Sequence, residues 1–148
     1  MLKRLMGTGN DVALTILRVV LGVVFFAHGA QKMLGWFGGF GFHGTMGAFT
    51  HMGMPAPMAL LIICTEFFAG LGLIVGLLTR IASFGVAGLM IGAIFMVHLP
   101  NGFFMNWMGT QKGEGFEFHL LALAMAAALL LRGAGAFSLD RAVAKAGG

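Results

Sequence analysis

VALTILRVVLGVVFFAHGAQKML occupies residues 12–34 and decides the class of fold. A helix needs about 20 mostly apolar residues to cross the hydrocarbon core of a bilayer, and this stretch has that length. It also carries Arg18, and it closes with His28, Gln31 and Lys32, which fall at positions i, i+3 and i+4 of one helix face. The stretch therefore predicts a membrane span with polar groups that a helix built only for lipid would not need.

The composition of the whole chain supports a membrane protein. Of its 148 residues, 59% are hydrophobic and 9% are charged, and the mean hydropathy is +0.95. A soluble globular domain has about 25% charged residues. A chain of this length cannot bury so much apolar surface in a core, so the surplus must face lipid. We predict one membrane domain over residues 1–148.

Three further apolar runs extend this prediction to a four-helix bundle. The predicted spans are residues 12–34, 57–78, 81–99 and 116–131. Pro55 and Pro57 mark the start of the second span, and Pro100 ends the third. We therefore expect an all-α integral membrane protein with four crossings.

The basic residues predict the orientation of the bundle. Positively charged residues accumulate in cytoplasmic loops, and four crossings place both termini on one side. The side with the termini would hold Lys3, Arg4, Arg80, Arg132, Arg141 and Lys145. Only Lys32 and Lys112 fall on the other side. We thus predict cytoplasmic termini, and outer loops rich in Gly, Phe and Met that fold as a lid over the helix ends. Basic residues at segment ends indicate topology and not a nucleic-acid site.

Ionisable side chains from all four spans fall in the outer half of the bilayer. His28 lies about 9 Å below the outer end of its span and Glu66 about 13 Å below, at about 1.5 Å per helical residue. His98 ends the third span, and His119 begins the fourth. A charge at the centre of a membrane helix costs roughly 2.5–3.5 kcal/mol, so such groups normally face the bundle interior and pair. We predict a polar pocket there.

The pocket gives the candidate site residues. We expect catalytic roles for Glu66, His28 and Lys32, and cofactor-binding roles for His28, Gln31, Arg18 and His119. The partner of Glu66 stays open between His28, Lys32, Arg18 and His119. Arg18 could instead extend toward the inner surface, or pair with Glu66 as a structural clamp. Lys32 could simply anchor the helix end.

The remaining histidines and Glu117 have structural alternatives. His98 and His119 could hydrogen-bond loop carbonyls, and Glu117, two residues from His119, should point away toward the loops. The same residues also offer ligands to a metal. His28, His98, His119 and Glu66 could hold haem iron or another transition metal, although no local metal motif supports this. Cys64 is the sole cysteine, which excludes an internal disulfide.

Three segments resemble the DoxX family of small four-helix membrane proteins. They are LRVVLGVVFFAHGAQKM at 17–33, CTEFFAGLGLIVGLLTRIAS at 64–83 and LLLRGAGAFSLDR at 129–141, the last with the ending G-x-G-x-x-S-x-D. The positions that match are Arg18, Gly22, His28, Gly29, Lys32, Glu66, Gly70, Gly76 and Arg80. The resemblance implies a four-helix bundle in a bacterial or archaeal inner membrane. The family takes its name from a subunit of a thiosulfate:quinone oxidoreductase.

Three functions are compatible with these features. The first is a redox-linked subunit whose pocket admits a quinone from the lipid, with Glu66 relaying protons. The second is a non-catalytic accessory or assembly subunit of a larger membrane complex, in which the charged pair is a clamp. The third is a haem- or metal-binding protein. We expect contact with the bilayer and with other membrane subunits or further copies of the chain.

Overall fold

The computed structural model describes residues 6–146, and every regular element in that range is helical. Lys3 and Arg4, on which part of the orientation argument rests, lie outside the described residues. The first long helix is α2 (Val12–Leu34), and the second is continuous through α4 (Ala56–Cys64), η2 (Thr65–Ala69) and α5 (Gly70–Val75). The third runs through α6 (Thr79–Ala93) and η3 (Ile94–His98), and α7 (Glu117–Arg132) follows. The short elements are η1 (Trp36–Gly38), α3 (Gly41–His51), η4 (Leu99–Asn101) and α8 (Leu139–Ala146).

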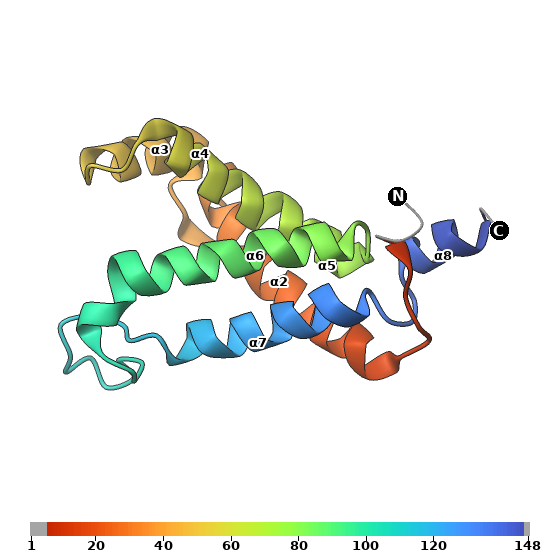
Figure 1. The fold of residues 1–148 in the computed structure, drawn as a ribbon. Coiled ribbons are helices and arrows are strands. Elements are labelled where there is room, and N and C mark those ends of the chain that lie inside the picture. Colours follow the sequence, from red (N-terminus) through yellow and green to blue (C-terminus); the bar gives the residue numbers. More distant parts are fainter. Residues whose placement is uncertain (1–5, 147–148) are drawn as a thin grey trace.

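The long helices run lengthwise between two ends of the molecule (Figure 1). One end holds the start of α2, the turn between α5 and α6, and α8; we call it the terminal end. The opposite end holds α3 and the loop of residues 102–116; we call it the loop end. The long helices separate toward the loop end, where α3 and the 102–116 loop lie apart from each other.

Within residues 6–146, three helices are long and apolar enough to cross a membrane. They are Val12–Leu34, Ala56–Val75 and Thr79–Asn101, with mean hydropathies of 2.0, 2.3 and 2.0. They match the predicted spans 12–34, 57–78 and 81–99. The fourth predicted span coincides with α7, which has 16 residues and hence a length of about 24 Å. Because the hydrocarbon core is about 30 Å thick, a crossing by α7 stays a prediction, as does the cytoplasmic placement of the termini.

Glycines allow α2 to pack directly on the second long helix. A Cβ on Gly29 would lie 2.4 Å from the Phe67 backbone nitrogen, and one on Gly70 would lie 2.4 Å from that of Phe26. A Cβ on Gly22 would meet Ile74 at 2.7 Å. Such contacts exclude any side chain at these positions, as expected for small-residue packing between membrane helices. The close approach fixes the level of α2 against η2, and therefore of Lys32 against Glu66.

The core between the helices is narrow and the outside is apolar. Buried residues include Leu21, Phe25 and Leu73, along with Val86 and Leu129. Large apolar side chains also cover the outside of the long helices, among them Ile16, Leu61, Phe84, Phe95 and Leu121. This distribution agrees with the prediction that the apolar surplus faces lipid.

Arg18 is the centre of the terminal end. Its side chain is 1% exposed, and its guanidinium donates to the backbone carbonyls of Leu73, Ile74, Ala134 and Phe137 at 2.5–3.1 Å. These bonds tie α2 to the end of α5 and to the tail that follows α7. The alternatives that Arg18 extends to the inner surface or pairs with Glu66 are therefore wrong, because its donors are occupied by carbonyls inside the fold.

Candidate functional site

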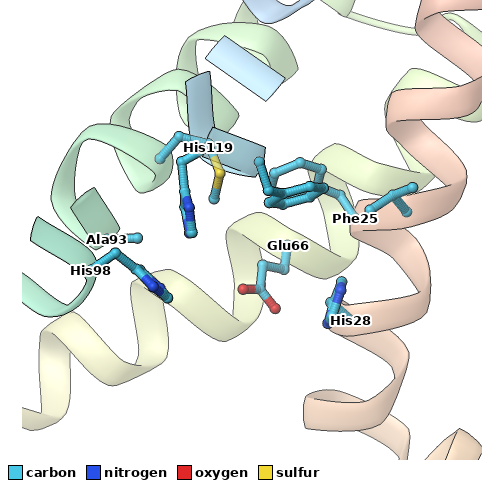
Figure 2. A pocket seen from close by; sticks show the side chains of 9 residues that line it. Phe25, His28, Glu66, Ala93, His98 and His119 are labelled. Carbon is cyan, nitrogen blue, oxygen red and sulfur yellow. The ribbon is translucent and has the colours of Figure 1, made fainter. Parts of the chain in front are cut away.

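A cavity of about 190 Å³ lies among the long helices toward the loop end. Figure 2 shows the polar side chains that face it: His28 from α2, Glu66 from the second long helix, His98 from the third and His119 from α7. The apolar part of the lining is Val24, Phe25, Met90, Ala93 and Phe118. One carboxyl group and three imidazoles from separate helices therefore meet in an otherwise apolar space.

Two π-helical segments bring side chains to the cavity. Glu66 belongs to η2 (Thr65–Ala69), and His98 ends η3 (Ile94–His98). A π-helical segment adds a residue to a turn and rotates the following side chains relative to a regular helix; such segments often occur at functional sites. The two irregular turns belong to neighbouring helices and both line the same cavity.

Glu66 forms an ion pair with Lys32. The Lys32 Nζ donates to Glu66 Oε2 at 2.5 Å, and the two side chains are 22% and 13% exposed. Lys32 is thus the partner of Glu66 among the alternatives left open by the sequence. Because both charges are largely removed from solvent, each depends on the other for compensation.

His98 and His119 stack against each other in the cavity wall. Their ring centroids are 4.0 Å apart. His98 Nδ1 lies 2.8 Å from the backbone carbonyl oxygen of Glu114. A carbonyl only accepts, so Nδ1 carries a proton, and in a neutral ring Nε2 is left as an acceptor. This confirms the expectation of a loop-carbonyl bond for His98.

His119 does not follow that expectation. The residue is 6% exposed, and its Nδ1 has no hydrogen-bond partner among the residues that the structure describes. Buried polar atoms in proteins are nearly always satisfied, and an exception calls for an explanation, such as a functional role. His119 lines the cavity, so this buried and unsatisfied nitrogen belongs to a ring of the cavity wall.

The other predicted residues occupy different places. His28 lines the cavity and is itself exposed, which puts it at the opening. Gln31 donates to the Phe37 carbonyl at 3.2 Å and does not line the cavity, so it stabilises the turn after α2. Arg18 lies at the terminal end. Of the residues predicted to bind a cofactor, His28 and His119 line the cavity, whereas Gln31 and Arg18 do not. Their binding roles stay predictions.

The sequence did not reveal the apolar walls of the cavity. Val24 and Phe25 lie one helical turn before His28, and Phe118 precedes His119. Their positions next to the histidines could have identified them as cavity residues. However, Phe residues are so numerous in this chain that this spacing did not distinguish them. Met90 and Ala93 come from a helix whose cavity-facing side the sequence did not identify.

Glu117 points away from the cavity, as predicted. Its carboxylate accepts from the backbone nitrogen of Met105 at 2.7 Å and from Trp107 Nε1 at 3.4 Å. Both partners belong to the loop of residues 102–116, so Glu117 attaches that loop to the start of α7. No residue of the two predicted lid regions, 35–56 and 100–115, is among those that line the cavity.

The four candidate metal ligands do not form a metal-binding cluster. Within residues 6–146, no three His, Cys, Asp or Glu side chains are grouped closely enough to hold a metal ion. His28, Glu66, His98 and His119 surround the space without converging on one point. Cys64 is half-buried and is not among the residues of the cavity lining.

Comparison with known proteins now identifies the class. The family model for DoxX matches residues 13–99, which is more than half of the chain, and the chain belongs to the DoxX family.

Two curated relatives align along nearly their whole length. The protein named "Putative oxidoreductase CatD" from Bacillus subtilis (strain 168) is 34% identical over 95% of this chain and 93% of its own. The protein named "Inner membrane protein YqjF" from Escherichia coli (strain K12) is 29% identical over 92% of this chain and 95% of its own. No solved structure matches at a significant level.

Proposed function

We propose that this protein is a redox-linked subunit of a bacterial inner membrane, and that its cavity binds the ring of a quinone. The observation that carries the proposal is an apolar cavity whose wall contains His28, Glu66, His98 and His119, the last with an unsatisfied, buried Nδ1. An apolar pocket with a few converging polar groups is the usual form of a small-molecule site. The oxidoreductase name of the Bacillus relative agrees with this class of function.

The size of the cavity favours a single ring. An engineered apolar cavity of about 150 Å³ binds benzene. The present cavity, at about 190 Å³, is slightly larger, and its apolar walls suit the two faces of a ring. Polar groups are distributed around it, so that ring oxygens on opposite sides of the molecule can each reach one of them. The isoprenoid tail of a quinone would leave past the exposed His28 into the lipid.

The chain's own residues would handle protons. Conversion of a quinone ring to its quinol adds two electrons and two protons. The electrons would be exchanged with a partner redox subunit of the membrane. The unprotonated Nε2 of a neutral His98 and the carboxylate of Glu66 are acceptors, and they would take the two quinol protons. In the reverse direction the same groups would return them. Lys32 would hold Glu66 in place and compensate its charge.

The proposal includes a topology. Four crossings with the terminal end in the cytoplasm would put Arg80, Arg132, Arg141 and Lys145 on the cytoplasmic side. The cavity would then lie in the outer half of the bilayer. A fusion of a reporter active only in the cytoplasm to the C-terminus, compared with fusions in the 102–116 loop, tests this arrangement. Activity from the loop fusion alone would contradict it.

Binding of a short-chain quinone to purified protein in nanodiscs tests the central claim. We expect saturable binding by calorimetry and loss of about tenfold in affinity for His119→Phe, which keeps an aromatic ring but removes the hydrogen bond. His51→Phe, at the end of α3 and outside the cavity lining, is the matched control. Absence of saturable binding by the wild type, or equal affinities for the two variants, would refute the assignment.

A non-catalytic accessory role is the second candidate, and one observation favours it. Trp107 is 85% exposed and Met108 is 88% exposed at the loop end, and Phe40 is 82% exposed on the approach to α3. Aromatic and Met side chains are enriched where proteins meet. Isolation of the chain in a stoichiometric complex, with normal function of that complex after His119→Phe, would select this role.

A further inference from the structure

The tail that follows α7 is fixed to the terminal end by buried hydrogen bonds. Arg18 donates to the carbonyl oxygens of Ala134 at 3.0 Å and Phe137 at 3.1 Å. The Asp140 side chain, 1% exposed, accepts from the backbone nitrogen of Leu78 at 2.7 Å and of Thr79 at 2.9 Å. These bonds hold both ends of the tail, so α8 starts in a defined direction.

This anchoring gives α8 two different flanks. Asp140 faces the protein. Arg141 and Lys145, one helical turn apart, share one flank, while Leu139 and Val143 lie about 200° away around the helix. Leu139 is 47% exposed and Val143 is 46% exposed. A short helix with basic residues on one flank and exposed apolar residues on the other is the pattern of a helix that lies at a membrane surface.

The basic flank lines a shallow pocket of about 270 Å³. Its residues are Phe137, Ser138, Arg141, Ala142 and Lys145. Phe137 has φ +48°, a left-handed backbone conformation that is unusual for a side chain of this size, and the residue is 83% exposed. The bond from Arg18 to the Phe137 carbonyl holds this conformation. The fold thus presents a bare aromatic ring beside two cations.

Within residues 6–146, neither Arg141 nor Lys145 forms an ion pair with a carboxylate. Asp11 accepts from the backbone nitrogens of Ala13 and Leu14, and Asp140 is occupied by backbone nitrogens too. Between residues 6 and 146 the one ion pair is Lys32–Glu66, at the loop end. Arg141 donates to the side-chain oxygen of Asn10, which is uncharged. The charge of the pocket is therefore complementary to an anion.

We propose that this pocket binds the phosphate of an anionic phospholipid. Figure 1 places α8 at the end where α2 starts and α5 ends, which is the level of lipid headgroups for helices that cross a membrane. Arg141 and Lys145 contact the phosphate, and Phe137 lies against the glycerol and the first acyl carbons. Leu139 and Val143 enter the boundary of the hydrocarbon. Basic clusters next to membrane helices attract anionic lipids in this way. The site is separate from the cavity and does not depend on the proposed quinone function.

Lipid retention by purified protein tests the proposal. The protein is exchanged into nanodiscs of phosphatidylcholine with or without phosphatidylglycerol, and bound lipid is counted by native mass spectrometry. We expect the wild type to retain phosphatidylglycerol in preference to phosphatidylcholine. Arg141→Gln with Lys145→Gln should weaken that retention about thirtyfold, the combined contribution of two basic residues at an anionic surface. Helix content by circular dichroism verifies folding of the variant.

A matched double variant separates the effect of the pocket residues from the effect of the net charge. Arg132→Gln with Lys112→Gln removes the same charge at exposed positions that do not line the pocket. It should retain phosphatidylglycerol like the wild type; an equal loss in both double variants would overturn the proposal. Phe137→Ser should weaken phosphatidylglycerol binding and leave the weak binding of glycerol phosphate unchanged. If glycerol phosphate displaces the lipid at equal concentration, the pocket is a general anion site and the lipid assignment fails.

Discussion

Replacement of Asp140 by Ala should strongly destabilise the protein at its terminal end. The carboxylate is buried, and its two oxygens accept from the backbone nitrogens of Leu78 and Thr79, where α6 starts. The carboxylate therefore acts as the N-terminal cap of α6 although it comes from a residue that is distant in sequence. Hydrogen bonds to a charged group contribute about 1.5–3 kcal/mol each. Loss of both should lower the free energy of unfolding by about 3–5 kcal/mol, and Asp140→Asn, which keeps one acceptor oxygen, by about half of that.

Asp11→Ala provides the comparison. Asp11 caps α2 with bonds of 2.9 and 3.3 Å to the backbone nitrogens of Ala13 and Leu14, but it is only half-buried. Its loss should cost about 1 kcal/mol, as for an ordinary helix cap. The assay is unfolding by sodium dodecyl sulfate in mixed micelles, followed by circular dichroism. If Asp140→Ala costs no more than Asp11→Ala, the reasoning that burial of these two bonds anchors the tail is refuted.

Three further outcomes follow from the contacts. In the same assay, Lys32→Met alone should lower the free energy of unfolding by about 3–5 kcal/mol, because it leaves Glu66 charged and unpaired. The double variant Lys32→Met with Glu66→Gln should recover much of this loss. If the single and the double variant lose the same free energy, the ion pair is solvated. Gly70→Ala should lower the free energy of unfolding by about 1–3 kcal/mol, because the added methyl group overpacks the contact with α2. Gly88→Ala, whose Cβ would meet nothing within 4 Å, should be neutral or stabilising. Comparable losses at both glycines would contradict the packing of α2 described above. His119→Phe should leave the free energy of unfolding unchanged or raise it, because it removes an unsatisfied buried nitrogen, and a loss above 2 kcal/mol would indicate a hidden structural bond.

Local sequence features were sufficient for the helices. The apolar runs and the prolines at 55, 57 and 100 predicted the helix limits to within a few residues. That His28, Glu66, His98 and His119 line one cavity was also predictable, because each lies at a similar depth in its span and none is stable alone in hydrocarbon. Depth along a helix depends only on the number of residues, which the sequence contains.

Rotation about each helix axis was not predictable. The residues at i, i+3 and i+4 were expected to share one face, yet His28 faces the cavity, Lys32 pairs with Glu66, and Gln31 bonds to the turn after the helix. The π-helical turns of η2 and η3 change the direction of Glu66 and His98 in a manner that a regular 3.6-residue period does not describe. The partners of Arg18 were not predictable, because they are backbone carbonyls, which have no signature in the sequence.

The sequence by itself determined that the chain is helical, that it belongs in a membrane, and which level of each long helix carries polar groups, because these depend on hydrophobicity summed along the chain. Only the tertiary structure decided which polar groups meet. Glycine contacts at Gly29 and Gly70 set the position of α2 against its neighbour, and this selected Lys32 for Glu66. The tertiary structure also showed that Arg18 and Asp140 bind backbone groups from distant segments. Hydrogen bonds to backbone atoms can be made by any sequence, and so they become visible only when the chain is folded.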